Sequence, residues 1–274
     1  MGRRKISPKR FLVYLILILA ALISIFPCYW MFASATNTSK AISDGRILPG
    51  TNLIPNLEHL FRDYPIWNGL SNALKIAVLS VVLSLIVTSL AAYGFEKFRT
   101  KRSEQAYVIF LIGMMIPQTS LVIPLYKMMA DMKLVNSHLS IILPAIGSIF
   151  LLFFFRQSFK SIPNEMIESA RIDGAGELRI FFQIVFPSMR ATYAAAAIYA
   201  FMTSWNAYMW PMISLSSEQK KTIILMVSKI ASSAYVADYG VQMVGLVIAT
   251  LPMMIVFLFL QRSFVDGLTG SVKG

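Results

Sequence analysis

The polar stretch at residues 163–187 carries the residues whose types and spacing could do the most specific chemistry in this chain. A Pro-Asn pair begins it, an Asp-Gly pair interrupts it and a second Pro ends it. Pro costs little in a first helical turn, Asn can cap free N–H groups, and Gly adopts the left-handed conformation that often ends a helix. The stretch therefore predicts two short helices, the second at about residues 177–185, joined by a turn at Asp173 and Gly174.

The first of these helices has the composition of a joint that contacts another protein. Met166, Ala170 and Ile172 fall near one side of it, which leaves Glu168 and Arg171 available to water. A carboxylate such as that of Glu168 can accept a charge-assisted hydrogen bond from a partner's Arg or Lys. Two plainer interpretations stay open: a solvated amphipathic loop, and a surface pair between Glu168 and Arg171 worth roughly a few tenths of a kcal/mol.

The spacing within this stretch resembles the EAA loop of ABC importer permeases, Glu-Ala-Ala-x3-Gly-x9-Ile-x-Leu-Pro. The string ESARIDGA resembles the carbohydrate-uptake branch of that family, although Ser169 stands for an Ala of the motif and Phe186 for its Leu. The resemblance implies a coupling helix that docks on an ATP-binding subunit. It assigns to this contact Glu168, Ser169, Ala170, Arg171, Asp173, Gly174, Ala175, Ile184 and Pro187.

The composition is that of an integral membrane protein. Of the 274 residues, 57% are hydrophobic and 14% are charged, against about 25% charged in an ordinary soluble protein. The net charge is +12, but the basic residues flank apolar segments, which argues against a nucleic acid as partner. The sequence has no Gly-x4-Gly-Lys-Ser/Thr motif and no cluster of residues with metal-ligand spacing. We therefore expect no metal, no cofactor and no enzymatic activity in this chain.

Six apolar segments have about the 20 residues that a helix needs to cross a bilayer. The predicted spans are residues 11–32, 72–95, 106–129, 139–155, 188–215 and 240–260. The first segment could also be a signal peptide, but its length and its Tyr29-Trp30 pair favour a retained span. Most of the 25 Lys and Arg residues fall in segments on one side, so the positive-inside rule places both termini in the cytoplasm.

This arrangement predicts three parts: a cytoplasmic N-terminus at residues 1–10, a six-span transmembrane domain at residues 11–264, and a cytoplasmic tail at residues 265–274. The coupling loop, residues 161–187, lies within the second part. The ending QRSFVDGLTGSVKG resembles the C-terminus of the same permeases. The expected fold is thus all-α and integral to the membrane, with six transmembrane helices, a cytoplasmic EAA coupling helix and the type I ABC importer permease fold.

A second group of residues is expected to line a substrate path at membrane depth. Pro117 and a second proline seven positions later predict a kinked or partly unwound span, which a membrane tolerates only against protein or a water-filled cavity. Amide and phenol groups beside an aromatic platform suit a neutral sugar. The candidate path consists of Gln118, Trp205, Asn206 and Tyr208. An interfacial aromatic belt, and a kink that serves packing alone, remain alternatives.

The resemblance implies a permease subunit of an ATP-driven importer that carries a sugar or oligosaccharide across the bacterial cytoplasmic (inner) membrane, similar to the smaller permease of maltose-type systems. The implied partners are a second permease subunit in a heterodimer, two ATP-binding subunits that hold ATP and Mg²⁺, and an extracellular or periplasmic solute-binding protein. An ion-coupled secondary transporter is an alternative, but the predicted spans lack the deep acidic residues typical of ion coupling. A membrane-embedded enzyme would need paired acids or an activated nucleophile on facing spans, and none is visible.

Overall fold

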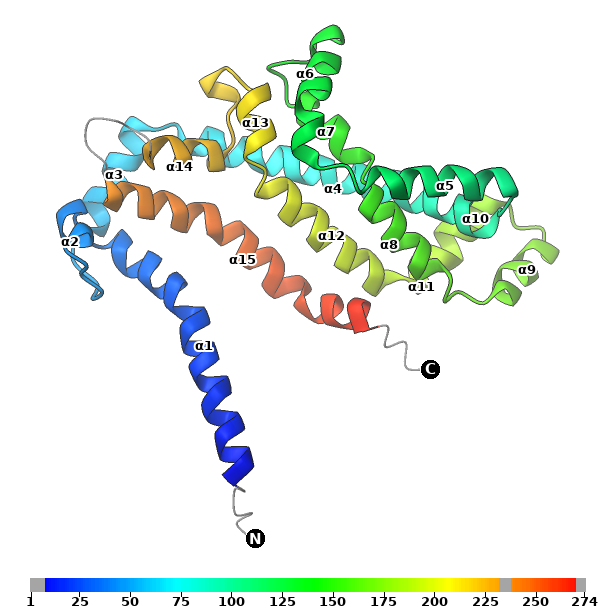
Figure 1. Cartoon of the computed structure of the whole chain (residues 1–274), viewed down its shortest axis with the longest axis horizontal. Helices are drawn as coiled ribbons and strands as arrows, with labels where there is room; N and C mark the ends of the chain where they lie inside the picture. Colours follow the sequence, from blue (N-terminus) through cyan, green and yellow to red (C-terminus); the bar gives the residue numbers. More distant parts are fainter. Residues whose placement is uncertain (1–7, 232–237, 270–274) are drawn as a thin grey trace. The chain divides into compact units, whose positions relative to one another are not determined.

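The computed structural model describes residues 8–231 and 238–269, and all regular secondary structure in these ranges is helical (Figure 1). The chain divides into two compact units. One unit comprises residues 1–66 and 227–250, and the other comprises residues 67–226 and 251–274. The all-helical membrane fold that the sequence predicts is confirmed.

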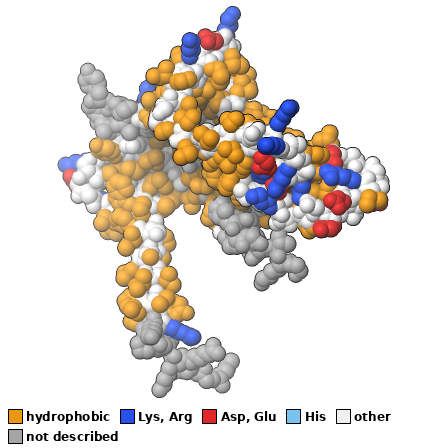
Figure 2. Space-filling view, turned by 45° about the vertical axis from the view of Figure 1, so that its right-hand side comes forward, with side chains coloured by type: hydrophobic (Ala, Val, Ile, Leu, Met, Phe, Trp, Pro, Cys, Tyr) orange, Lys and Arg blue, Asp and Glu red, His pale blue; other side chains and the backbone are white. Residues whose placement is uncertain are grey.

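The first unit begins with α1 (Pro8–Ala35), whose most apolar window has no buried residue. Figure 2 shows hydrophobic side chains along the visible length of this helix, as expected for a helix that faces lipid. Two short helices follow, α2 (Ser39–Ser43) and α3 (Leu53–Asp63). The Nδ2 group of Asn56 in α3 donates to the carbonyl oxygens of Ala35 and Asn37 at 2.9 Å each, which fixes α3 against the end of α1.

The second unit contains the residues that the sequence singles out. Its helices are short except for the long helix α4 (Ile66–Lys97). The others are α5 (Lys101–Gly113), η1 (Gln118–Leu121), α6 (Val122–Asp131), α7 (Leu139–Ile146), α8 (Ile149–Phe159), α9 (Asn164–Ile172), α10 (Glu177–Ile180), η2 (Phe181–Val185), α11 (Phe186–Ser188), α12 (Arg190–Trp205), α13 (Met209–Ser214) and η3 (Glu218–Lys220). Two helices run from one unit into the other, α14 (Ile223–Ala231) and α15 (Tyr239–Thr269).

The core of the second unit is aromatic and is centred on α8. Phe155 and Phe159 have no exposed surface. The ring of Phe155 lies 4.7 Å from that of Tyr193 in α12, and the ring of Phe159 lies 6.4 Å from that of Tyr93 in α4. Small residues of α12 such as Ala196 are buried in the same cluster and let this helix pack closely against α8.

The expected count of six spans is not confirmed. Within the part of the chain that the structure describes, four helical segments are long and apolar enough to cross a membrane: Arg10–Ala35, Ile66–Lys97, Leu139–Phe159 and Tyr239–Phe259. The pair Lys101–Gly113 and Gln118–Asp131 can form a fifth, although it bends by 99° at its break. The predicted span at residues 188–215 is divided into short helices, and the longest of them, α12, has 16 residues. That length is below the roughly 20 residues that a bilayer requires.

The prediction of an unwound segment at Pro117 is confirmed, because α5 ends at Gly113 and η1 begins at Gln118. The second proline, Pro124, does not break the backbone. It lies in the first turn of α6, where its missing N–H costs no hydrogen bond. A single proline therefore accounts for the bend.

Several predicted loops are more ordered than expected. The connection between α4 and α5 shrinks to residues 98–100, because Thr100 and Ser103 cap α5 reciprocally through N–H···Oγ bonds of 2.8 and 3.1 Å. The predicted outer loop after α13 contains η3 and α14. The helix α15 continues into the predicted tail as far as Thr269, and residues 1–7 and 270–274 lie outside the described residues.

Candidate functional site

The stretch expected to couple to another subunit forms two short helices, as predicted. The first helix, α9, ends at Ile172, and α10 begins at Glu177 and continues through η2 to Val185. Gly174 has a φ of +80°, the left-handed conformation that the Asp-Gly pair predicts. The Ala175 N–H donates to the Ala170 carbonyl oxygen at 3.0 Å, which closes the end of α9.

The start and the buried face of α9 differ from the prediction. Asn164 is the first helical residue and does not cap the helix; its Oδ1 accepts a hydrogen bond from Lys97 Nζ at 2.9 Å. Ile167 and Ala170 form the buried face, whereas Ile172 is 86% exposed. The assignment of Met166 and Ile172 to the inner side is therefore wrong. The aromatic core beneath α9 receives the side chains at 167 and 170 instead.

Arg171 joins the two helices of the stretch. Its Nε donates to Glu177 Oε1 at 2.6 Å, and Glu177 Oε2 accepts from the hydroxyl of Tyr93 at 2.9 Å. The hydrogen bond from Arg171 lowers the pKa of the Glu177 carboxyl, and the same bond raises the pKa of Arg171. The sequence did not predict this ion pair, because Arg171 and Glu177 lie on opposite sides of the turn at Gly174 and follow no helical periodicity. It gave Glu168 as a possible surface partner of Arg171 instead.

The nine residues assigned to coupling divide between an outer and an inner group. The outer, exposed group consists of Glu168, Ser169, Arg171, Asp173 and Gly174. The inner group, buried or half-buried, consists of Ala170, Ala175, Ile184 and Pro187. The outer group is flanked by exposed apolar side chains, among them Ile172 and Leu178, the latter 67% exposed. In Figure 2, charged side chains gather at the end of the second unit that carries α5, α9 and α10.

A cavity of about 710 Å³, the charged cavity, opens beside α9. It is lined by Glu96, Lys97, Arg99, Lys160, Ile162, Pro163, Asn164, Ile167, Glu168 and Arg171. Lys97 Nζ, at the end of α4, donates to the Ile162 carbonyl oxygen at 3.1 Å as well as to Asn164. The end of α4 is thereby tied to the start of the coupling stretch.

A buried ion cluster lies behind the charged cavity. Arg156 of α8, with 5% of its side chain exposed, donates through Nε to Glu96 Oε2 at 3.3 Å and also pairs with Glu104. Its guanidinium lies 3.9 Å from the ring centroid of Tyr107. Arg99 pairs with Glu96 from the other side. The cluster joins α4, α5 and α8, and the sequence alone does not reveal it because its members come from separate segments that meet only through packing.

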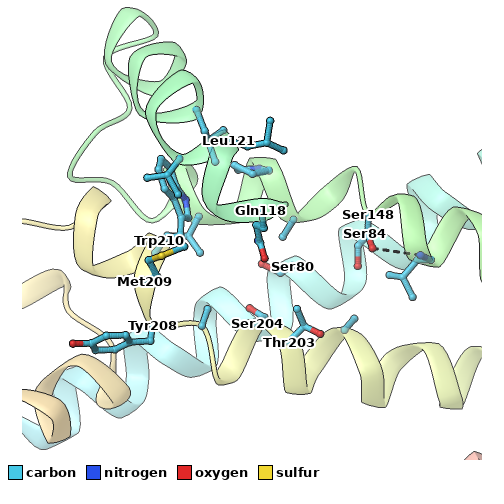
Figure 3. Close-up of a pocket in the computed structure, with 18 of the residues that line it drawn as sticks. Ser80, Ser84, Gln118, Leu121, Ser148, Thr203, Ser204, Tyr208, Met209 and Trp210 are labelled. Atoms are coloured by element: carbon cyan, nitrogen blue, oxygen red, sulfur yellow. Dashed lines mark hydrogen bonds between the residues drawn. The ribbon is translucent and has the colours of Figure 1, made fainter. Parts of the chain in front are cut away.

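A second cavity, of about 840 Å³, lies farther along the same unit (Figure 3). We call it the uncharged cavity, because no Asp, Glu, Lys or Arg lines it. Its polar side chains are Ser80, Ser84, Gln118, Ser148, Thr203, Ser204, Tyr208 and Trp210. Figure 3 shows Gln118 from η1, Ser80 from α4 and Ser204 from α12 approaching one another across this space.

The structure brings two of the four predicted path residues to the uncharged cavity, Gln118 and Tyr208. Figure 3 shows the Tyr208 ring directed away from Gln118. Trp205 is 2% exposed, stacks on Phe201 at 5.4 Å between ring centroids and does not line the cavity. Asn206 is exposed, and its Nδ2 lies 3.3 Å from Met253 Sδ, also away from the lining.

The serines of the uncharged cavity were missed by the sequence reading. Ser80 and Ser84 are four residues apart, so they share one face of α4. Thr88 continues the same spacing. A row of hydroxyl residues at intervals of four in an apolar segment is a signal that could have found them.

Comparisons with known proteins agree with this architecture. Residues 84–270 match the family described as binding-protein-dependent transport system inner membrane component. Because the match covers more than half of the chain, the chain belongs to this family of inner membrane permeases.

Two relatives are similar in sequence over nearly the whole chain, and one solved structure shares its fold. It is 46% identical over 260 residues to the lactose transport system permease protein LacG of Rhizobium radiobacter, covering 95% of each chain. It is 33% identical over 274 residues to the arabinooligosaccharides transport system permease protein AraQ of Bacillus subtilis, covering 98% of this chain and 97% of that one. Its fold matches a chain in the crystal structure of a bacterial ABC transporter that imports the acidic polysaccharide alginate, with a TM-score of 0.85 and 22% identity over 96% of this chain and 99% of the other.

Proposed function

We propose that this chain is one of the two transmembrane subunits of an ATP-driven ABC importer that carries a sugar or oligosaccharide into the bacterial cytoplasm. The observation that carries this proposal is the exposed helix–turn–helix at α9 and α10 with the spacing of an EAA loop, hydrogen-bonded to the long apolar helix α4 through Lys97 and Tyr93. The names of the relatives, for lactose and arabinooligosaccharides, support a saccharide as substrate.

The proposed partners follow from this function. A second permease subunit completes a heterodimer, and a binding protein delivers the sugar from outside. Two ATP-binding subunits bind ATP and Mg²⁺ and dock on α9 from the cytoplasm. This arrangement places both termini of the chain on the cytoplasmic side, in accord with the excess of basic residues in the segments assigned to that side.

The coupling step is proposed to act through α9 as a rigid lever. Glu168 offers a carboxylate to a basic group of the ATPase, and the neighbouring Ile172 adds exposed apolar surface. The bond between Arg171 and Glu177 makes α9 and α10 move together. Lys97 passes the displacement to α4, which carries Ser80 about 26 Å away at 1.5 Å per residue. ATPase closure at one end can therefore change the uncharged cavity at the other.

The proposed sugar path runs through the uncharged cavity. Gln118 and Tyr208 line it, and Asn206 is exposed near the end of α12, where it can contact the sugar outside the cavity. Trp205 is proposed to support this end of the path through its packing on Phe201.

The test of coupling is Gly174→Asp in the assembled complex. Only glycine takes a φ of +80° freely, and an added carboxylate beside Asp173 would face the ATPase, so substrate-stimulated ATP hydrolysis should fall at least about tenfold while the chain still inserts. Gly174→Asn, which tolerates positive φ and adds no charge, is the matched control and should retain most of the stimulation. Unchanged transport in Gly174→Asp would contradict the proposal.

ATP dependence distinguishes this function from an ion-coupled transporter. Uptake by cells that express the complex should stop when ATP is depleted and should survive dissipation of the ion gradients. A tag on this chain should also recover an ATPase subunit. Uptake that follows the ion gradient alone would replace the proposal with secondary transport.

A further inference from the structure

We propose that this subunit itself holds a saccharide subsite in which Ser80, Ser204 and Gln118 bind hydroxyl groups, and that its uncharged lining selects neutral over anionic sugars. The inference rests on the proposed transport function and adds to it the binding residues and the charge class of the substrate. It assigns a direct sugar contact to this chain and not to its partner permease alone.

The first observation is a pair of buried hydroxyls that have no partner. The Oγ atoms of Ser80 and Ser204 are buried, and neither makes a hydrogen bond. Both residues line the uncharged cavity, and Ser80 as a whole is 2% exposed. A buried hydroxyl without a partner is unfavourable. A ligand that fills the cavity with hydroxyl groups would satisfy both serines, since each hydroxyl can donate once and accept twice.

Three other polar side chains of the cavity already make hydrogen bonds. Ser84 Oγ donates to the Val81 carbonyl oxygen at 3.1 Å, and Thr203 Oγ1 donates to the Tyr199 carbonyl oxygen at 2.9 Å. Trp210 Nε1 donates to the Ser140 carbonyl oxygen at 2.9 Å. Ser80 and Ser204 therefore differ from these three side chains, because their hydroxyl groups have no hydrogen-bond partner among the described residues.

The second observation is that three polar side chains converge from three elements. Ser80 comes from α4, Ser204 from α12, and Gln118 from η1 directly after the break at Pro117 (Figure 3). The Gln118 amide supplies both a donor and an acceptor, so the three side chains together can match the mixed donors and acceptors of a sugar ring. Apolar and aromatic walls complete the cavity and suit the C–H faces of a sugar.

The third observation is the absence of charge from this lining. A carboxylate or phosphate that entered would lose hydration and meet no Lys or Arg of this subunit. A neutral disaccharide meets no such penalty. The volume of about 840 Å³ falls within the range of roughly 300–1,000 Å³ in which small-molecule sites lie.

Uptake by serine variants tests the subsite. The complex is captured through a tag on this chain, reconstituted with its binding protein in vesicles that contain ATP, and assayed with lactose, arabinotriose and a galacturonate disaccharide. For whichever neutral sugar is carried, the double variant Ser80→Ala and Ser204→Ala should lower uptake about tenfold or more. Recovery of the double variant in the assembled complex, at the parent's yield, is measured alongside and shows that the lost uptake does not come from failed assembly.

Ser214→Ala is the matched control. Ser214 Oγ is also buried and without a partner, and the residue belongs to the same unit, but it does not line the cavity. This variant should transport like the parent. If it loses as much uptake as the double variant, the loss reflects packing and the subsite is overturned.

Protection of an introduced thiol by bound sugar measures whether the cavity prefers a neutral or an anionic saccharide. This measurement does not depend on the binding protein. Cys28 is the single cysteine, so Cys28→Ser provides a background for Ser204→Cys. A small methanethiosulfonate reagent should label this thiol in the complex, and the transported neutral sugar should slow labelling at least about threefold, whereas the galacturonate disaccharide should not.

The outcomes separate the two proposals. ATP-dependent uptake that is indifferent to both serines, or equal protection by the neutral and anionic disaccharides, overturns the subsite and leaves the transport function standing. Absence of ATP-dependent uptake for every saccharide overturns the transport function and the subsite with it.

Discussion

The two cavities of the unit formed by residues 67–226 and 251–274 share one long helix but have opposite chemistry. Ser80 and Ser84 of α4 line the uncharged cavity, and Glu96 and Lys97 of the same helix line the charged cavity. Charges are costly at membrane depth and are tolerated where a span ends and water reaches it. The contrast therefore separates a region whose chemistry suits a neutral ligand from a region whose charges suit an aqueous surface.

The two cavities are also held together by different interactions. Behind the charged cavity, Arg156 pairs with two carboxylates and joins three helices. Farther along the unit, where the loop after α6 meets the loop after α13, the side chain of Asn136 makes only neutral hydrogen bonds among those described. Asn136 N–H donates to the Ser214 carbonyl oxygen at 2.7 Å, and its side chain exchanges bonds of 2.7 and 3.1 Å with Ser217. Loss of the ionic support should consequently cost more than loss of the neutral one.

The largest effect is expected from Arg156→Met. This change leaves the buried Glu96 with only the exposed Arg99 as counter-charge and removes the partner of Glu104, and breaking a buried pair in this way costs about 3–5 kcal/mol of folding free energy. The apparent melting temperature of the detergent-solubilised complex, followed by size-exclusion chromatography after heating, should fall sharply. Lys160→Met, an exposed lysine of the same cavity, is the control and should change stability by no more than about 0.5 kcal/mol.

If Arg156→Met alone prevents assembly of the complex, a double variant tests the same ion cluster. Combining Arg156→Met with Glu96→Gln removes the stranded charge and should restore part of the stability. If the double variant is no more stable than Arg156→Met, the ion cluster does not determine stability at this end of the molecule.

A smaller loss is expected from Asn136→Ala. Asn136 has a φ of +59°, so alanine would add roughly 1 kcal/mol of backbone strain to the loss of two side-chain hydrogen bonds worth about 1 kcal/mol each. Asn136→Gly removes the same hydrogen bonds, but glycine adopts this backbone conformation without strain. The loss of folding free energy in Asn136→Gly should therefore be smaller than in Asn136→Ala by the strain energy. The same melting measurement on both variants checks the difference, and equal melting temperatures would contradict the strain argument.

The sequence predicted local features of this molecule better than contacts between residues far apart in the chain. The turn at Gly174 and the break at Pro117 were predicted correctly, because each follows from the backbone of one residue type. The pairs of Arg156 with Glu96 and of Arg171 with Glu177 were missed, because they depend on how separate segments pack.

The sequence also failed to predict which residues of α12 line the uncharged cavity. The sequence reading chose Trp205 and Asn206 for their chemical character, yet neither lines the cavity, because the helical phase of α12 turns Trp205 into the core. Ser204, one position earlier, faces the cavity. A one-residue step rotates a helical side chain by about 100°, and composition alone does not specify that rotation.

The smallest effect, and the one that tests the charged region most finely, is expected from Glu177→Gln. Arg171 holds the pKa of Glu177 below its ordinary value, so the pair contributes stability that is present above the ordinary carboxyl range and is lost as the pH falls through the lowered pKa. Both side chains are 39% exposed, and solvent screening limits the contribution to less than about 1 kcal/mol at neutral pH. The melting temperature of the parent should exceed that of Glu177→Gln near pH 7, and the gap should narrow as the solution is acidified below the ordinary carboxyl pKa. Arg179→Gln is the matched control, since Arg179 bonds only to the neutral Gln183 among the described hydrogen bonds and its gap should not depend on pH. A gap that widens in acid would show that the pair opposes folding, and the rigid link between α9 and α10 would then have to come from their packing.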